Sequence, residues 1–325
     1  MVTITLQKIA ELAHVSKCAA SYAFSDNPAK RGKLSEETRQ RILAVAAELN
    51  YHPSVAGRGL ALSRSYSLGL LLPRKNVQSF SPHAMGMFHG VADAISKSDY
   101  ILPLFFGWSE KLETNLRQHR LDGLLVMARM QESPVFDKLN QLDIPVLCLN
   151  RRSCGPKAFS VMTDMQGWVC DSLALFASRG YKRAILFTSG PTALAMDVDL
   201  AAHFPALCQA HGLAAQVDIV DNFDGTAPAG TALLFRGNAA KLQVWFAKGS
   251  SSRRRTAVFC APEKCAEMGY PLDCCSYHDS NLLGATGVRT LLDAVEKRNV
   301  KHSVRLPYQK ALEFKPCPNT FLEEF

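Results

Sequence analysis

A short predicted helix near the amino terminus presents hydrogen-bonding side chains on one of its faces. Lys17 and Ser21, and likewise Cys18 and Tyr22, are four residues apart, so each pair lies one turn apart on the same side. Ser16 is a favourable N-cap residue for this helix, which we expect to end at Phe24. The ammonium, thiol, hydroxyl and phenol groups of this face are free to contact a polar partner.

Two further predicted helices would hold this helix in place. The first carries an apolar stripe at positions i, i+3, i+4 and i+7, formed by Leu6, Ile9, Ala10 and Ala13. The third begins after Ser35, and its stripe is formed by Ile42, Val45, Ala46 and Leu49. Three short helices with a tight turn between the first two are typical of a helix-turn-helix domain, whose second helix enters the major groove of DNA. A small helical bundle without this role is the alternative.

The charge of this segment indicates the class of its partner. Residues 1–66 contain nine Lys and Arg against five Asp and Glu, a net charge of +4, which is half of the +8 of the whole chain. A basic module favours a polyanion, although a solvated basic surface would have the same composition. Residues 54–66 contain two glycines, two arginines and no acidic residue. Because glycine weakens so short a helix, we expect this stretch to become helical only against a partner.

Four stretches of the chain resemble the lactose-repressor/galactose-repressor family of bacterial transcription regulators. They are residues 9–16 (IAELAHVS), 35–42 (SEETRQRI), 50–53 (NYHP) and 58–60 (RGL). The resemblance is strong over residues 1–73 and looser beyond. It implies that Lys17, Cys18 and Tyr22 read base edges, that Thr5, Ser16 and Ser21 contact phosphates, and that Arg58 and Leu60 belong to a hinge helix in the minor groove. There Leu60 would act as an apolar wedge that kinks DNA.

Three features depart from this family pattern. Tyr22 stands where the family commonly has arginine, and a phenol cannot form the bidentate bond to guanine that a guanidinium forms. His14 replaces the usual glycine of the turn, at a position expected to need a positive φ. Residues 27–33 form a longer and more basic loop than usual, which is either an additional phosphate clamp or a solvated insertion. We therefore expect an operator that differs from the family's usual one.

The larger part of the chain alternates apolar runs with helical stretches. Continuous apolar strands joined by helices indicate a parallel sheet covered on both faces. The predicted strands lie within 68–72, 100–106, 122–127, 145–150 and 184–189, and predicted helices include 84–97 and 282–297. The fold class is therefore α/β, with an all-α helix-turn-helix domain followed, as the resemblance implies, by two doubly wound lobes like those of periplasmic sugar-binding proteins.

The resemblance also implies a small-molecule effector in a cleft between the lobes. Its predicted contacts follow the strand ends, where ligands of such sheets gather: His83 with Ala84, Asn150, Arg151, Asp164, His278 and Asp279. Several positions depart from the family, because the arginine that usually holds the sugar is Leu200 and the first Asp of a usual pair is His278. The chain after Asp279 also looks shortened. An ordinary pentose or hexose would leave buried hydroxyls unpaired here, so we expect an unusual effector or none.

Other signals exclude several classes of protein. No P-loop, GxGxxG, GxSxG or HExxH motif is present, so we expect no enzyme activity and no cofactor. Ten cysteines without a CxxC pair favour reduced, mostly buried thiols, and their spacing matches no metal site. No apolar run is long enough to cross a bilayer and no secretion signal precedes the first helix, so we expect a cytoplasmic protein without a membrane partner.

These observations predict three segments and one function. Residues 1–52 would be the DNA-binding domain, 53–66 the hinge helix or linker, and 67–325 the two-lobed effector-binding and dimerisation domain. We expect a homodimeric regulator, acting as a repressor, that binds a near-palindromic operator in double-stranded DNA under the control of a small effector. The alternatives are a small-ligand-binding protein without a DNA target, and a constitutive DNA binder whose effector site no longer functions.

Overall fold

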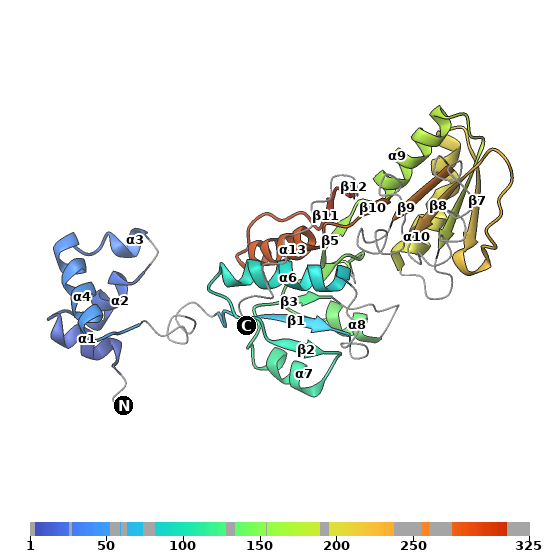
Figure 1. Cartoon of the computed structure of the whole chain (residues 1–325). Coiled ribbons are helices and arrows are strands. Elements are labelled where there is room, and N and C mark those ends of the chain that lie inside the picture. The colour runs from blue at the N-terminus through green and yellow to red at the C-terminus, as the bar shows by residue number, and fades with distance from the viewer. Residues whose placement is uncertain are drawn as a thin grey trace, which may run out of the picture. The chain divides into compact units, whose positions relative to one another are not determined.

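The computed structural model describes residues 4–25, 28–52, 59, 64–73, 82–127, 134–153, 155–188, 195–236, 255–259 and 275–310. The chain divides into two compact units, Met1–Tyr66 and Ser67–Phe325 (Figure 1). Arg58, Leu60 and most of the predicted hinge segment 53–66 lie outside the described residues. The expectations for them therefore stay predictions.

The N-terminal unit is made of helices. They are α1 (Leu6–Leu12), α2 (Lys17–Ala23), α3 (Pro28–Arg31) and α4 (Glu36–Glu48). The three predicted helices are confirmed, with α2 ending one residue early because Phe24 is its C-cap. The short helix α3 was not predicted and lies in the basic segment that we expected to be a loop.

Side-chain caps and a small core hold these helices together. The side chains of Thr5, Ser16 and Ser35 each accept a hydrogen bond from a backbone N–H in the first turn of the helix that follows. The predicted apolar stripes supply the core, formed by Ile9, Ala10, Ala13, Ala20, Ala23, Ile42 and Ala46. Small residues dominate this core, so the helix axes can approach closely.

The turn between α1 and α2 has a backbone that few side chains tolerate. His14 has a φ of 52°, which confirms the expectation that this position needs a positive φ. Its geometry is supported from α4, because Arg41 donates from Nε to the carbonyl oxygen of Ala13 over 3.2 Å. This bond joins residues 28 positions apart and gave no signal in the sequence pattern.

The first sheet of the large unit has six strands in the order β11-β5-β4-β3-β1-β2, all paired in parallel. Their bounds are β1 (Leu68–Leu72), β2 (Leu104–Phe106), β3 (Gly123–Val126), β4 (Val146–Leu149), β5 (Phe159–Thr163) and β11 (Ser303–Leu306). Helices α6 (Pro82–Ser96) and α13 (Ser280–Val295) cover one face, and α7 (Glu110–Arg117) covers the other together with α8 (Pro134–Asn140) (Figure 1).

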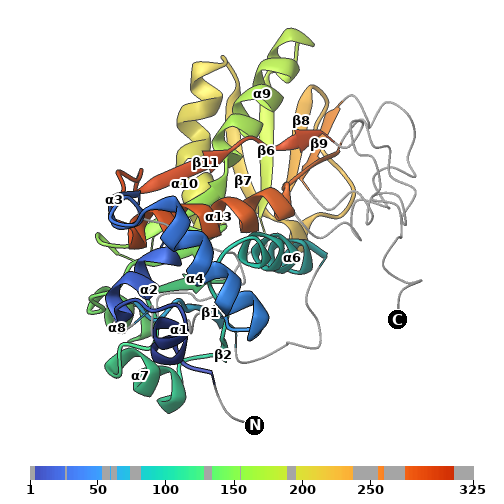
Figure 2. The same ribbon diagram turned by 90° about the vertical axis from the view of Figure 1, so that its left-hand side faces the viewer.

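The second sheet has the order β12-β10-β9-β8-β6-β7. Its strands are β6 (Arg183–Thr188), β7 (Ala214–Ile219), β8 (Thr231–Arg236), β9 (Thr256–Phe259), β10 (Cys275–Tyr277) and β12 (Gln309–Lys310). Helices α9 (Met165–Ser178) and α10 (Ala195–Ala210) pack on one face, which Figure 2 shows side by side. The prediction of two parallel α/β lobes is confirmed, except that β12 pairs antiparallel with β10.

The chain passes between the two sheets at three places. It leaves the first sheet after β5 and enters α9 of the second lobe, returns from β10 into α13, and passes again from β11 to β12. Residues at the ends of β5 and β10 therefore come together, although they are more than a hundred positions apart in the sequence.

Helices α6 and α13 pack unusually closely because glycines face each other across their contact. A Cβ atom added to Gly90 of α6 would lie 2.0 Å from the carbonyl oxygen of Asn281, and one added to Gly284 of α13 would lie 2.1 Å from the carbonyl oxygen of Met87. These contacts are with backbone atoms, which cannot rotate out of the way. Only glycine permits this helix spacing.

The expectation of reduced cysteines is wrong for Cys275. Cys18, Cys148, Cys170 and Cys208 are free thiols, whereas Cys275 at the start of β10 takes part in a disulfide bond. Sequence spacing shows no disulfide framework, because pairing depends on which chain segments the fold brings together.

Within the described residues, no helix is both long and apolar enough to cross a membrane.

The glycine contact predicts a large effect of one added methyl group. Gly284→Ala should lower the free energy of unfolding of the large unit by about 1–3 kcal/mol, because overpacking against backbone outweighs the better helix propensity of alanine. Urea unfolding would measure this, with Ala92→Ser on the exposed side of α6 as a control that should change stability by less than about 0.5 kcal/mol. Unchanged or increased stability of Gly284→Ala would contradict the packing argument.

Candidate functional site

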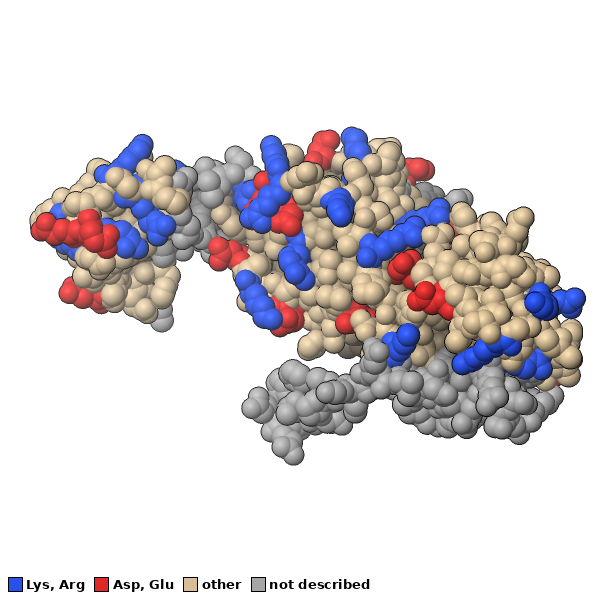
Figure 3. Space-filling view, turned by 90° about the horizontal axis from the view of Figure 1, so that it is seen from above, with Lys and Arg blue, Asp and Glu red and all other residues tan. Residues whose placement is uncertain are grey.

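The predicted contact face of α2 is open to solvent. Lys17, Cys18 and Ser21 are exposed and Tyr22 is partly buried, whereas Ala20 and Ala23 on the opposite side are buried. The helix thus packs by one face and presents the other, as predicted. Figure 3 shows several Lys and Arg side chains on the visible face of the helical unit.

The three predicted phosphate-contacting hydroxyls remain available as donors. Thr5 Oγ1 accepts from the backbone N–H of Lys8 over 3.3 Å, and Ser16 Oγ accepts from that of Ala19 over 3.1 Å. A hydroxyl has one hydrogen and two lone pairs, so capping leaves its hydrogen free. Thr5, Ser16 and Ser21 are all exposed and can donate to an anionic oxygen.

The unpredicted helix α3 brings a lysine to the contact face. Lys33 Nζ lies 5.6 Å from the centroid of the Tyr22 ring, within the range of a cation–π contact. The backbone N–H of Lys33 donates to the carbonyl of Lys30 over 3.2 Å and that of Gly32 donates to Pro28 over 2.8 Å. These bonds fix the course of the chain from Pro28 to Lys33. No sequence pattern indicated this contact.

In the large unit, three of the six predicted effector residues meet in one cluster. His83 Nδ1 lies 2.6 Å from Ser280 Oγ, and His83 Nε2 lies 2.7 Å from Asn150 Nδ2. His278 Nδ1 lies 2.7 Å from Thr163 Oγ1, and the two imidazole rings are 4.4 Å apart between centroids. Their elements are the start of α6, the end of β4 and the two crossing points after β5 and β10.

Asn150 occupies a constrained position in this cluster. It follows β4 with a φ of 49°, a conformation that asparagine tolerates better than most residues. Its amide nitrogen faces His83, while its Oδ1 is buried and has no hydrogen-bond partner among the described residues. A buried acceptor without a partner costs about 1–3 kcal/mol, so a donor group placed there would bind favourably.

The other three predicted effector residues have structural partners instead. Asp164 caps α9 through the backbone N–H of Gly167, and Asp279 caps α13 through that of Leu282. The guanidinium of Arg151 lies 4.3 Å from the centroid of the Phe136 ring. These contacts stabilise helix starts and a side-chain stacking arrangement next to the cluster.

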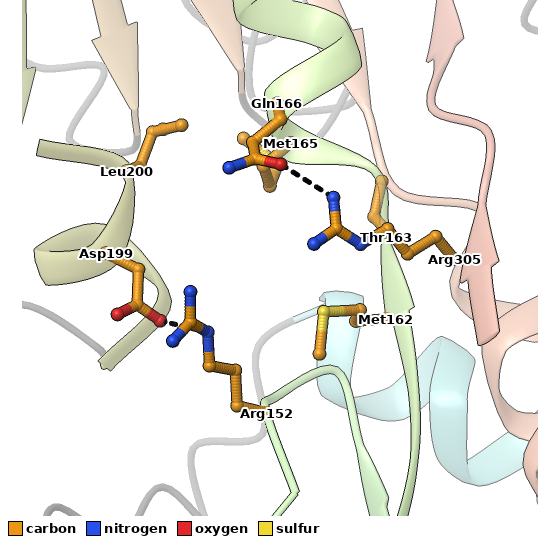
Figure 4. A pocket seen from close by; sticks show the side chains of 8 residues that line it. All are labelled: Arg152, Met162, Thr163, Met165, Gln166, Asp199, Leu200 and Arg305. Atoms are coloured by element: carbon orange, nitrogen blue, oxygen red, sulfur yellow. Dashed lines mark hydrogen bonds and ion pairs between the residues drawn. The ribbon is translucent and has the colours of Figure 1, made fainter. Parts of the chain in front are cut away.

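A pocket lies beside the cluster at the crossing points, and its polar groups are paired with one another. Arg152 Nε lies 2.5 Å from Asp199 Oδ2, and Arg305 donates to Gln166 Oε1 over 2.7 Å (Figure 4). Leu200 lines the same pocket, and only 3% of its surface is exposed. Two guanidinium groups line this pocket, and they belong to Arg152 and Arg305. The sequence patterns did not single out either residue.

The free space around Arg152 and Arg305 lies in two neighbouring pockets of different volume. The pocket that contains Leu200 has a volume of about 40 Å³, far below the roughly 300–1,000 Å³ of small-molecule sites. A neighbouring hollow has about 390 Å³ and shares Arg152, Met162 and Arg305 with the first. A ligand of sugar size would therefore not fit in the pocket at Leu200 alone, whereas the neighbouring hollow lies at the lower end of that range.

The electrostatics of the cluster disfavour a charged histidine. Burial, the adjacent His83 imidazole and the nearby Arg236 guanidinium, in that order of effect, lower the pKa of His278 well below its usual value. Native His278 is therefore neutral at neutral pH. In the unfolded chain the same imidazole would titrate near pH 6.5.

This difference predicts a loss of stability in mild acid. As the pH falls below about 6.5 the unfolded chain gains a proton that native His278 resists, which costs up to about 1.4 kcal/mol per pH unit. His278→Gln should reduce the fall in unfolding free energy between pH 7.5 and 5.5, measured by urea titration. His89→Gln, at an exposed position of α6, should not. Equal effects of the two substitutions would exclude this origin.

Comparison with known proteins supports the arrangement of a helical unit followed by a two-lobed α/β unit. Residues 5–54 match the model of bacterial regulatory proteins, lacI family. The sucrose operon repressor of Klebsiella pneumoniae is 32% identical over 166 residues, 50% of this chain and 48% of the repressor. The ribose operon repressor of Bacillus subtilis is 29% identical over 197 residues, 58% of this chain and 56% of the repressor. The chain thus spans about half the length of the curated relatives it matches.

Solved structures share the fold over nearly the whole chain. A complex of the transcriptional regulator CelR with cellobiose has a TM-score of 0.58 at 20% identity, covering 95% of this chain and 99% of that one. The lac repressor bound to ONPG has a TM-score of 0.59 at 17% identity, covering 95% and 98%. The helical unit of this chain therefore matches the model of bacterial regulatory proteins, lacI family, over residues 5–54, and it is joined to a two-lobed α/β unit with the fold of the lac repressor.

Proposed function

We propose that the protein is a sequence-specific transcription regulator that acts as a repressor and binds a near-palindromic operator as a homodimer in the cytoplasm. The observation that carries this proposal is the exposed polar face of α2 within a domain that matches the lacI family. Two copies of such a face, related by twofold symmetry, would read two half-sites in successive major grooves.

The contacts with DNA divide into two kinds. Lys17, Cys18 and Tyr22 would read base edges, whereas Thr5, Ser16 and Ser21 would donate to phosphates and set the register. Arg58 and Leu60 would contribute through the minor groove. Because a phenol offers one donor and one acceptor site and an apolar ring, Tyr22 would select its base pair by a single hydrogen bond and by contact with a thymine methyl group.

The large unit would regulate this binding through a small effector. The relatives named above are repressors of sucrose and ribose operons, and a structure of the same fold contains cellobiose. Here the unpaired Oδ1 of Asn150 favours a ligand with a hydroxyl or N–H donor, held beside His83 and His278. Such a ligand changes DNA affinity only by its difference in affinity for the two arrangements of the lobes.

One observation favours a second candidate, a constitutive DNA binder. The histidine cluster is largely satisfied by its own side chains, and the pocket at Leu200 is small. In this case the large unit would serve dimerisation alone, and no small molecule would alter the affinity for DNA.

The DNA-reading role predicts that one lysine determines sequence preference. Lys17→Ala should weaken binding to the preferred duplex by about 5- to 150-fold while affecting other duplexes less, because a base contact is lost. The preferred duplex would come from selection on randomised DNA, and fluorescence anisotropy would compare it with variants. Lys8→Ala, an exposed lysine of α1 paired with Glu11, is the control. An equal loss on every duplex would make Lys17 a phosphate contact.

The effector role predicts a saturable binding heat. Calorimetric titration of the full chain with panels of sugars, polyols and nucleobases should identify at least one ligand, and Asn150→Ala should abolish its binding. Asn115→Ala, a partly buried asparagine of α7 outside the cluster, should leave it unchanged. If no compound gives saturable heat, the constitutive candidate replaces the regulated one. Binding that survives Asn150→Ala would place the ligand elsewhere.

A further inference from the structure

Residues 28–34, which precede α4, follow a defined course beside the contact face. Helix α3 is followed by Gly32 and Lys33, and the backbone N–H of Leu34 donates to the carbonyl of Arg31 over 3.0 Å. The side chain of Leu34 then packs against the core of the helical unit. Lys33 is therefore held between two anchored points, and its ammonium extends over the Tyr22 ring.

The three cations of this segment have different surroundings. Arg31 lies near Glu36, whose pKa is lowered chiefly by the hydrogen bond from Gln40, with smaller effects from Arg39 and Arg31. In the part of the chain that the structure describes, Lys30 lies over no aromatic ring. Lys33 is thus the one of these three cations that the structure joins to a predicted base-reading side chain.

The contact of Lys33 with the Tyr22 ring limits a conformational freedom that tyrosine has at this position. A guanidinium is directed by a bidentate hydrogen bond to guanine, whereas a phenol makes a single hydrogen bond and its ring can turn about two side-chain torsions. Tyr22 is only partly buried, so the helical core does not enclose it. A cation above the ring restricts these torsions before DNA binds, which reduces the ordering cost of binding.

We infer that Lys33 is a positioning residue for sequence recognition, whose ammonium holds the Tyr22 phenol towards the base edge that it reads. The inference rests on the proposed DNA-reading function and assigns a role to the basic segment that separates α2 from α4. Lys33 acts through Tyr22, so its effect falls on discrimination at one base pair, whereas a phosphate contact would affect all sequences alike.

The test uses the full chain and the duplex that the wild type enriches from a randomised pool, together with every single-base-pair variant of that duplex. The proteins compared are wild type, Lys33→Gln, Lys33→Arg, Lys30→Gln, Tyr22→Leu and the double variant Tyr22→Leu/Lys33→Gln. Affinities are measured at several salt concentrations, and thermal melting establishes that each variant is folded. Lys30→Gln makes the same charge change three residues away.

Lys33→Gln should reduce discrimination between the preferred base pair and its variants by about two- to fivefold, which is the effect of losing an exposed cation–π contact. The reduction should occur at the same base pair at which Tyr22→Leu loses discrimination. Lys33→Arg should retain discrimination, and Lys30→Gln should weaken all duplexes equally. In the Tyr22→Leu background, Lys33→Gln should cause no further loss of discrimination.

Three results would overturn the inference. Lys33→Gln could lower the affinity for every duplex by the same factor, in the wild-type and in the Tyr22→Leu background alike. Lys33 would then be a phosphate contact only. Full discrimination by Tyr22→Leu would show that the phenol reads no base. A wild-type protein that enriches no sequence from the randomised pool would overturn the proposed function and this inference with it. The first two results differ from this one, because they are obtained only when the wild type does enrich a sequence.

Discussion

The three passages of the chain between its two sheets are the constraint on which the large unit depends. They bring Thr163 at the end of β5 and His278 after β10 within hydrogen-bonding distance, beside His83 and Asn150 of the first lobe. Carboxylates at two of the passages, Asp164 and Asp279, begin the helices that follow. A movement of one lobe against the other must therefore alter the contacts of His278 with Thr163 and His83.

Close packing limits where such movement can occur. The backbones of α6 and α13 touch through Gly90 and Gly284, so the histidine at the start of α6 and the serine at the start of α13 keep a fixed separation. The second lobe approaches this rigid pair through His278, and the ion pair of Asp199 in α10 with Arg152 after β4 is a second contact between the lobes. Polar contacts of this kind are more readily exchanged than a glycine-mediated backbone contact.

In the helical unit a similar relation holds between a rigid frame and an adjustable contact face. Buried alanines and the bond from Arg41 to the turn hold α2 in position, while its outward side chains vary without cost to the core. Tyr22 is one of these outward side chains and is only partly buried. The ammonium of Lys33, which follows α3, lies over the ring of Tyr22 on this face.

The sequence by itself determined the three main helices of the helical unit and the parallel strands of the large one, because apolar periodicity and N-cap residues act within a few residues of each other. The positive φ of His14 was expected from the resemblance, which places a glycine at this turn. Only the tertiary structure decided that His83, Asn150 and His278 meet while Asp164 and Asp279 cap helices, that Cys275 is bonded, and that Lys33 lies over Tyr22. These contacts join segments whose separation along the chain has no periodic signature, so they depend on how complete elements pack.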